Sequence, residues 1–228
     1  MTCRGSVPAG PSTLICVFAK PAYPGMVKTR LAARYGQRWA ADLARAFFVD
    51  TWRATSSLTW ARSVVATTDV DAAQWQAAGV GAGMVWPQGG GDLGCRLERV
   101  LERALGEADQ AIAIGADTPG IPPQLLWRAG RALTATDAVL GPSSDGGFYL
   151  VGLKRCPTGL FVGLPWSDRT TLWATHGRLL QLGMKVRLLE PWFDVDRSDD
   201  LDRLRQLLGT GAISAPATEL LLAQDPCP

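Results

Sequence analysis

Short apolar runs alternate with segments of helical periodicity along most of the chain. Apolar runs of the length of buried strands occur at residues 13–19, 63–67, 83–86, 111–115, 137–141, 147–153 and 185–190. Apolar residues recur at helical spacing over residues 37–54, 70–77, 95–108, 122–134, 168–182 and 199–208. Strands that alternate with helices in this way are typical of an α/β protein with a mostly parallel sheet.

The regular pattern predicts one domain over residues 13–210. It leaves a flexible N-terminus at residues 1–12 and a partly apolar C-terminal tail at residues 211–228. A chain of 228 residues is long enough to bury a full core as a single domain.

Charge and cysteine content narrow the class of protein. The net charge is only +2 and there is no polybasic run, which argues against a nucleic-acid partner. The apolar run at residues 14–19 is too short to span a bilayer, and residues 1–12 lack the apolar core of a signal peptide. Five cysteines without C-x-x-C spacing predict neither a disulfide framework nor a zinc site. We therefore expect a cytoplasmic protein with no membrane partner.

The loop KPAYPGMVKTRL follows the first predicted strand. Gly25 allows backbone N–H groups to approach a phosphate, and Lys28 and Arg30 can neutralise its charge. The loop is neither a Walker A motif nor a G-x-G-x-x-G motif. From spacing alone, a phosphate site and a loop of solvated basic residues are equally good interpretations.

Two glycine-rich loops follow other predicted strands. In QGGGDLGCR the bare backbone could face a base or ribose, and Asp92 and Arg96 could bind it, although capping of the next helix by Asp92 is the stronger interpretation. In SSDGGFY, Asp145 with Gly146 and Gly147 could orient an acceptor hydroxyl or bind a sugar. The Asp-Gly pair favours a hairpin turn at the same position.

The last two loops of interest contain acidic residues. Asp117 in GADTPG follows a central strand, where a carboxylate suits Mg²⁺ or Mn²⁺ but can equally form an Asx turn. In WFDVDRSDDL, an extended backbone places Asp194 and Asp196 on one face. Two carboxylates this close are costly unless a cation lies between them, so they form a candidate metal site. Ser198 is the predicted N-cap of the following helix.

Five motifs in order, FAKPAYPGMVKTRLA, QGGGDLGCRL, GADTPGIP, DGGFYLVGL and FDVDRSDDL, cover residues 14 to about 208. With them the chain resembles bacterial glycosyltransferase-A-type proteins, labelled radical-SAM/selenodomain-associated transferases, of the nucleotide-diphospho-sugar transferase superfamily. More distantly it is similar to molybdenum-cofactor and 2-phospholactate guanylyltransferases. The resemblance implies a single-domain, three-layer αβα, Rossmann-like GT-A fold with a mostly parallel central sheet.

The resemblance also implies roles for individual residues. Nucleotide contacts would come from Ala19, Lys20, Gly25, Lys28, Arg30, Gln88, Gly91, Asp92 and Arg96. Asp117, Asp196 and Asp194 would hold Mg²⁺ or Mn²⁺, and Asp145, Gly146 and Gly147 would face the acceptor or sugar. The catalytic residues would be Lys28, Arg30, Asp117 and Asp145.

Three functions follow from this pattern. The family resemblance favours glycosyl transfer from an NDP-sugar to a small-molecule acceptor. Asp117-Thr118-Pro119 is more similar to the Asp-x-Pro loop of nucleotidyltransferases, which join an NTP to a phosphorylated or phosphonate acceptor and release pyrophosphate. A non-catalytic nucleotide-binding module is the third. The single histidine, His176, lies within a predicted helix and offers little support for Ser–His or Cys–His chemistry.

Overall fold

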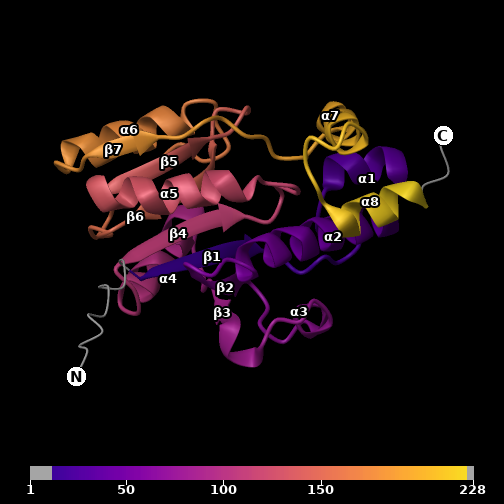
Figure 1. Cartoon of the computed structure of the whole chain (residues 1–228), viewed down its shortest axis with the longest axis horizontal. Helices are drawn as coiled ribbons and strands as arrows, with labels where there is room; N and C mark the ends of the chain where they lie inside the picture. The colour runs from indigo at the N-terminus through magenta and orange to yellow at the C-terminus, as the bar shows by residue number, and fades with distance from the viewer. Residues whose placement is uncertain (1–11, 225–228) are drawn as a thin grey trace, which may run out of the picture.

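Seven strands form one central sheet in the order β3-β2-β1-β4-β6-β5-β7 (Figure 1). The computed structural model describes residues 12–224. The strands are β1 (Thr13–Ala19), β2 (Arg62–Thr67), β3 (Val85–Pro87), β4 (Gln110–Gly115), β5 (Ala138–Pro142), β6 (Phe148–Leu153) and β7 (Val186–Leu188). Neighbouring strands are parallel except that β6 runs antiparallel to both β4 and β5. The predicted mostly parallel sheet is confirmed.

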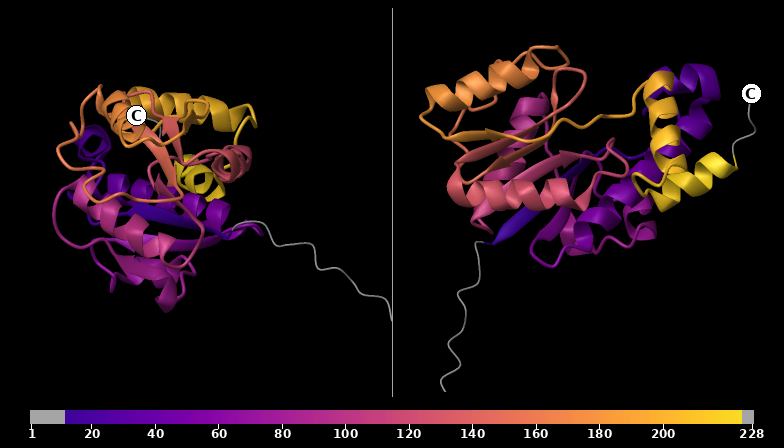
Figure 2. Two further views of the ribbon diagram at one scale, coloured as in Figure 1. Left: turned by 90° about the vertical axis from the view of Figure 1, so that its left-hand side faces the viewer. Right: turned by 45° about the horizontal axis from the view of Figure 1, so that its top comes forward.

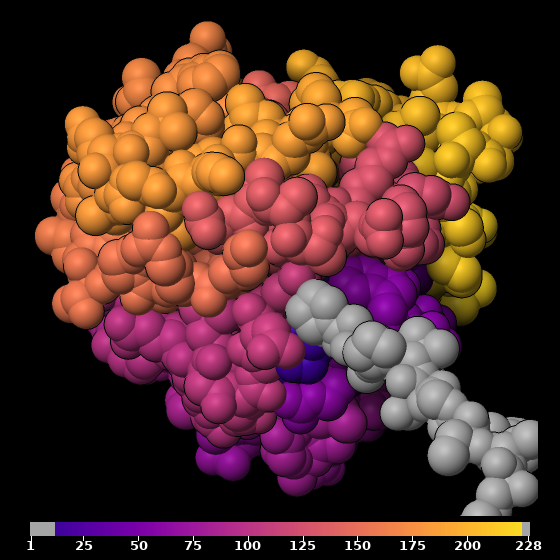
Figure 3. Space-filling model, turned by 60° about the vertical axis from the view of Figure 1, so that its left-hand side comes forward, coloured from indigo at the N-terminus to yellow at the C-terminus, as the bar shows by residue number. Residues whose placement is uncertain are grey.

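Helices cover both faces of the sheet. They are α1 (Thr29–Tyr35), α2 (Gln37–Ser56), α3 (Ala73–Ala77), the 3-10 turn η1 (Ala82–Met84), α4 (Leu93–Leu105), α5 (Pro123–Ala135), α6 (Thr171–Gln181), α7 (Ser198–Gly209) and α8 (Pro216–Ala223). Cys16 of β1 packs in the cluster that contains α4 and α6, whereas its neighbour Ile15 packs with α2 and α5. This alternation along a buried strand produces the predicted three-layer αβα arrangement. The two halves of the chain pack directly against each other (Figure 3).

A third apolar cluster lies at one end of the molecule, where α1, α7 and α8 gather beside α2 (Figures 1 and 2). Its buried members are Leu31, Leu43, Phe47, Phe193, Val195, Leu201 and Leu204. Leu31 belongs to α1 and Leu201 to α7, so segments from opposite ends of the chain share this core. The cluster therefore brings the first basic loop to the last acidic motif.

The structure corrects the expected start of α7. The predicted N-cap, Ser198, is already the first helical residue, and Arg197 occupies the N-cap position. The carboxylate of Asp200 reaches back and accepts hydrogen bonds from the backbone N–H groups of Asp196 at 3.1 Å and Arg197 at 2.9 Å. Asp200 thus satisfies N–H groups at the helix start, and the prediction for Ser198 is wrong.

Two helices lie where none was predicted. Helix α1 begins inside the expected phosphate loop, and α8 lies within the expected C-terminal tail. Of the expected flexible segment at residues 1–12, only Ser12 belongs to the described part, and residues 225–228 of the tail also lie outside it. Among the helices within residues 12–224, none is long and apolar enough to cross a membrane.

A buried carboxylate fastens α8 to α2. Asp50 is 5% exposed and accepts hydrogen bonds from the backbone N–H groups of Ala217 at 2.9 Å and Thr218 at 2.8 Å. The hydroxyl of Thr218 donates a third at 2.7 Å. These N–H groups belong to the first turn of α8, where a helix has no internal partners for them.

We expect Asp50→Ala to lower the free energy of unfolding by about 1–3 kcal/mol, because it leaves buried donors without an acceptor. Urea denaturation followed by circular dichroism measures the change. Asp42→Ala is the matched control, since Asp42 lies on the same helix and pairs with the exposed Arg45. Its loss should stay within about 0.5 kcal/mol. Equal losses for both variants would contradict the assigned role of Asp50.

Candidate functional site

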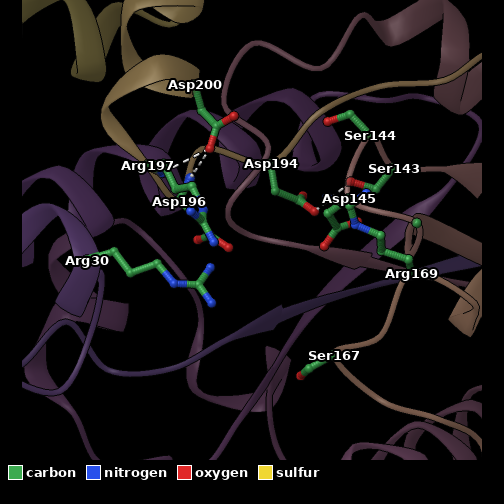
Figure 4. Close-up of a pocket in the computed structure, with 11 residues that line it drawn as sticks. Arg30, Ser143, Ser144, Asp145, Ser167, Arg169, Asp194, Asp196, Arg197 and Asp200 are labelled. Atoms are coloured by element: carbon green, nitrogen blue, oxygen red, sulfur yellow. Dashed lines mark hydrogen bonds between the residues drawn. The ribbon is translucent and has the colours of Figure 1, made fainter.

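A two-part cleft opens beyond the carboxyl ends of β1 and β4, the edge at which α/β sheets generally bind ligands. The strand-end cavity has a volume of about 510 Å³ and is lined by Phe18, Ala19, Lys20, Met26, Val27, Lys28, Ala44, Phe48, Gln88, Leu93, Arg96, Gly115, Ala116, Asp117, Ser167 and Asp196. The hairpin cavity has a volume of about 780 Å³ and is lined by Arg30, Ser143, Ser144, Asp145, Gly146, Ser167, Arg169, Asp194, Asp196, Arg197 and Asp200 (Figure 4). The two cavities meet at Ser167 and Asp196.

Lys28 stands at this junction between two carboxylates. Its Nζ lies 2.9 Å from Oδ1 of Asp117 and 2.9 Å from Oδ1 of Asp196. The Lys28 side chain is only 3% exposed, and the Phe47 ring lies with its centroid 5.5 Å from the ammonium. Burial opposes the charge, but the two carboxylates outweigh it and raise the pKa of Lys28. The ammonium therefore stays charged.

The backbone at Lys28 is in an unusual conformation. Lys28 has φ 46° and ψ 41°, the left-handed region that a residue other than glycine rarely adopts. It occupies the N-cap position of α1, and its carbonyl accepts a hydrogen bond from the N–H of Ala32 at 2.8 Å. The turn at Gly25, with φ 79°, precedes it. The backbone is thus strained at Lys28, the residue whose ammonium reaches both carboxylates.

Asp194 and Asp196 have different partners, although both line the hairpin cavity. Burial opposes ionisation of Asp196, but Lys28 and the nearby arginines lower its pKa overall. Asp194 accepts a hydrogen bond from the Ser143 hydroxyl at 2.9 Å. Burial, reinforced by the negative charge of Asp117, raises the pKa of Asp194 to about 7. The pair that shares a cation is therefore Asp117 with Asp196.

The strand-end cavity contains most of the residues predicted to contact a nucleotide. Ala19, Lys20, Lys28, Gln88 and Arg96 line it. The Gln88 side chain is buried and its Nε2 donates to the carbonyl of Ala66 at 2.8 Å, so it fixes the loop after β3.

The other four predicted nucleotide residues lie elsewhere. Arg30 lines the hairpin cavity, whereas Gly25, Gly91 and Asp92 are not among the lining residues of either cavity. Asp92 accepts a hydrogen bond from the N–H of Cys95 at 2.8 Å and caps α4, as the capping interpretation predicts.

The predicted acceptor loop forms the turn between β5 and β6, which confirms the hairpin interpretation. Asp145 and Gly146 line the hairpin cavity. Gly147 is not among its lining residues, and its N–H donates to Oδ1 of Asp145 at 2.9 Å. Asp145 is exposed.

Several cavity residues carry no signal in the sequence. Ser167 and Arg169 come from the connection between β6 and α6, because α6 begins at Thr171 and not at residue 168 as predicted. Met26 and Phe48 form apolar wall in the strand-end cavity. Arg197 could have been found from its position beside Asp196.

The Asp117–Asp196 pair fits a divalent cation in its donor chemistry. Mg²⁺ is commonly bound by one or two carboxylates together with water and substrate phosphates. Both side chains are about half exposed, at 54% and 47%, and both direct an oxygen to one cation, the Lys28 ammonium. Within residues 12–224 no group of three or more His, Cys, Asp or Glu side chains forms a metal-binding cluster. A metal at this pair would need water or phosphate oxygens as further ligands, and Lys28 would have to withdraw.

Solved structures share the fold. A protein from Desulfovibrio desulfuricans G20, provisionally assigned as a nucleotide-diphospho-sugar transferase, is 30% identical with a TM-score of 0.84, over 93% of this chain and 94% of that chain. A CMP:2-keto-3-deoxy-manno-octonic acid synthetase complexed with CTP is 16% identical with a TM-score of 0.54, over 88% and 99%. A 4-diphosphocytidyl-2C-methyl-D-erythritol synthase from Anaerococcus prevotii is 10% identical with a TM-score of 0.58, over 86% and 96%. The last two likenesses show the fold alone.

Sequence comparison gives the family. A search of curated proteins finds no match. Residues 51–168, more than half of the chain, match one family model. With this match and the relative from Desulfovibrio desulfuricans, the chain belongs to the bacterial family described as "Uncharacterized protein conserved in bacteria (DUF2064)".

Proposed function

We propose that the protein is a nucleotide-utilising transferase that moves a glycosyl group from an NDP-sugar to a small-molecule acceptor. The observation that carries this proposal is that two cavities meet at Asp196, whose carboxylate pairs with Lys28 beside Asp117. A transfer reaction needs a donor and an acceptor held on either side of the reacting bond. The provisional assignment of the Desulfovibrio desulfuricans relative supports the same class of donor.

The strand-end cavity is the donor half. Met26, Phe48 and Leu93 supply apolar wall for a base, while Lys20 and Arg96 add positive charge. Lys28 pairs with Asp196, which also lines the hairpin cavity, so the diphosphate would lie at this side of the strand-end cavity. The donor sugar would then face the hairpin cavity.

Glycosyl transfer breaks the bond between the anomeric carbon and the diphosphate oxygen and forms a bond to an acceptor oxygen. Lys28 and Arg30 stabilise the charge that develops on the leaving diphosphate. Asp145 accepts the proton of the acceptor hydroxyl, because it is an exposed carboxylate on the wall of the hairpin cavity. A Mg²⁺ or Mn²⁺ ion held by Asp117 and Asp196 would supply further charge neutralisation of the phosphates.

Nucleotidyl transfer is the second candidate, and the sequence Asp117-Thr118-Pro119 favours it. An acceptor phosphate or phosphonate would attack the α-phosphorus of an NTP, and pyrophosphate would leave. The nucleophile is already anionic, so this reaction needs no base. In a third possibility, a non-catalytic binding module, the protein would bind nucleotide without turnover.

Thermal unfolding with Mn²⁺ and a panel of NTPs, NDPs and NDP-sugars tests the assignment. A ligand at 100 times its Kd stabilises the folded state by about 2.7 kcal/mol. We expect one NDP-sugar to raise the melting temperature more than its NDP does. A response to one NTP, with no response to any sugar nucleotide, would contradict glycosyl transfer and support nucleotidyl transfer.

We expect Lys28→Met to weaken NDP binding by roughly ten- to hundredfold, because it removes a charged partner of the phosphates. Binding of the corresponding nucleoside should not change. Isothermal titration calorimetry measures both affinities. Lys154→Met, which alters an exposed lysine outside both cavities, is the control. Equal losses of nucleoside and NDP affinity would contradict the phosphate role of Lys28.

The same variant tests the relation between Lys28 and the metal. In the absence of nucleotide we expect Lys28→Met to bind Mn²⁺ at least about tenfold more tightly than the parent protein, since two neighbouring carboxylates lose their counterion. Electron paramagnetic resonance of free Mn²⁺ gives the affinity. Adding Asp117→Asn to the variant should abolish the gain. A gain that survives this second change would place the metal elsewhere.

A further inference from the structure

Three arginines from separate segments line the hairpin cavity. Arg30 comes from α1, Arg169 from the connection before α6, and Arg197 from the N-cap of α7. All three are exposed, and in Figure 4 Arg30 and Arg169 extend toward the cavity from opposite sides. None of them forms an ion pair with a carboxylate among residues 12–224. Their guanidinium groups are therefore available to a ligand.

The carboxylates of the cavity already have partners. Asp196 pairs with Lys28, and Asp194 accepts from the Ser143 hydroxyl. Asp200 accepts from the backbone at the start of α7, and Asp145 accepts from the N–H of Gly147. The lining of the cavity carries three arginines and four carboxylates, and one of these carboxylates, Asp196, is already paired with Lys28 of the strand-end cavity. The unpartnered hydrogen-bond donors on the arginines favour anionic oxygen atoms.

The position of Arg169 depends on Gly146. Gly146 has φ 95°, and a Cβ there would overlap the backbone of Arg169 at its carbonyl oxygen. The carbonyl of Gly146 accepts a hydrogen bond from the N–H of Leu172 at 2.9 Å. The β5–β6 hairpin and the segment that carries Arg169 are thus in direct backbone contact. A side chain at Gly146 would push Arg169 out of place.

We propose that the hairpin cavity binds an acceptor that carries a phosphate or carboxylate group, held by Arg169 and Arg197, while Arg30 faces the leaving diphosphate. Gly146 is a positioning residue that lets Arg169 approach this group. That the bound anion is an acceptor rests on the proposed function, whereas the anion site itself rests on the geometry of the cavity. A guanidinium offers its donors in a planar fork that matches both phosphate and carboxylate oxygens.

Titration of the whole protein with glycerol 3-phosphate, lactate and glycerol tests the proposal and separates phosphate from carboxylate. We expect one of the two anions to bind and glycerol not to bind, as followed by calorimetry and ligand NMR. Arg169→Gln should lower the affinity for the anion by roughly ten- to hundredfold. Arg187→Gln, which alters an exposed arginine on β7 outside the cleft, should have no effect. Unchanged anion affinity in Arg169→Gln, or glycerol binding as tight as anion binding, overturns the proposal.

Two further sets of variants identify where the anion binds. If Lys20→Gln abolishes binding and Arg169→Gln does not, the anion occupies the strand-end cavity and the proposal fails. Gly146→Ala should lower the affinity for the anion. Gly163→Ala should leave it unchanged, because Gly163 also has a positive φ, 69°, but has open space for a Cβ. Should Gly146→Ala fail to fold, Arg169→Gln carries the test alone.

The outcome is separable from that of the proposed function. Anion binding through Arg169 without stabilisation by any nucleotide would leave the anion site standing and contradict the transferase. Nucleotide binding without an Arg169-dependent anion would contradict only the anion site.

Discussion

The position of the Lys28 ammonium between Asp117 and Asp196 is the interaction on which the site depends. It joins the start of α1, the end of β4 and the segment before α7, and Lys28 and Asp196 are separated by 168 positions in the sequence. A charge this deeply buried is costly unless opposite charges accompany it. The two carboxylates meet that requirement, so the loops that carry them must stay close together. The third apolar cluster packs two of these segments together, through Leu31 of α1 and Val195 before α7.

This arrangement divides the cleft by chemistry. The strand-end cavity combines backbone, apolar wall and a few basic side chains, whereas the hairpin cavity is lined almost entirely by charged and hydroxyl groups. Asp196 and Ser167 belong to both. Ser167 has a left-handed backbone with φ 61°, so unusual conformations occur at both sides of the junction. Function on a fold of this type resides in such a site and not in the sheet itself.

Most of the sheet could be predicted because its signal is local. β1 lies inside the sheet between β2 and β4, and almost all of its side chains are buried. It is therefore a continuous apolar run in the sequence, and this run ends where the strand ends. Helix α1 escaped prediction because it has seven residues and a single fully buried side chain, Leu31. The misplaced N-cap at Ser198 has a different cause. There the carboxylate of Asp200 does the capping from within the helix, and the pattern Ser-Asp-Asp does not distinguish the two arrangements.

The sequence by itself determined the order of the strands and of most helices, and the loops that meet at the sheet edge. It also identified part of the charge in the cleft, namely Lys28, Arg30, Asp117, Asp145, Asp194 and Asp196. Only the tertiary structure decided which of these charges pair. It joined Lys28 to the carboxylates, separated Asp194 from Asp196, and brought Arg169 against Gly146. The physical reason is the distance along the chain over which each kind of contact acts. Periodicity records contacts within a few residues, whereas ion pairs and close backbone approaches depend on distances that exist only after the sheet has assembled.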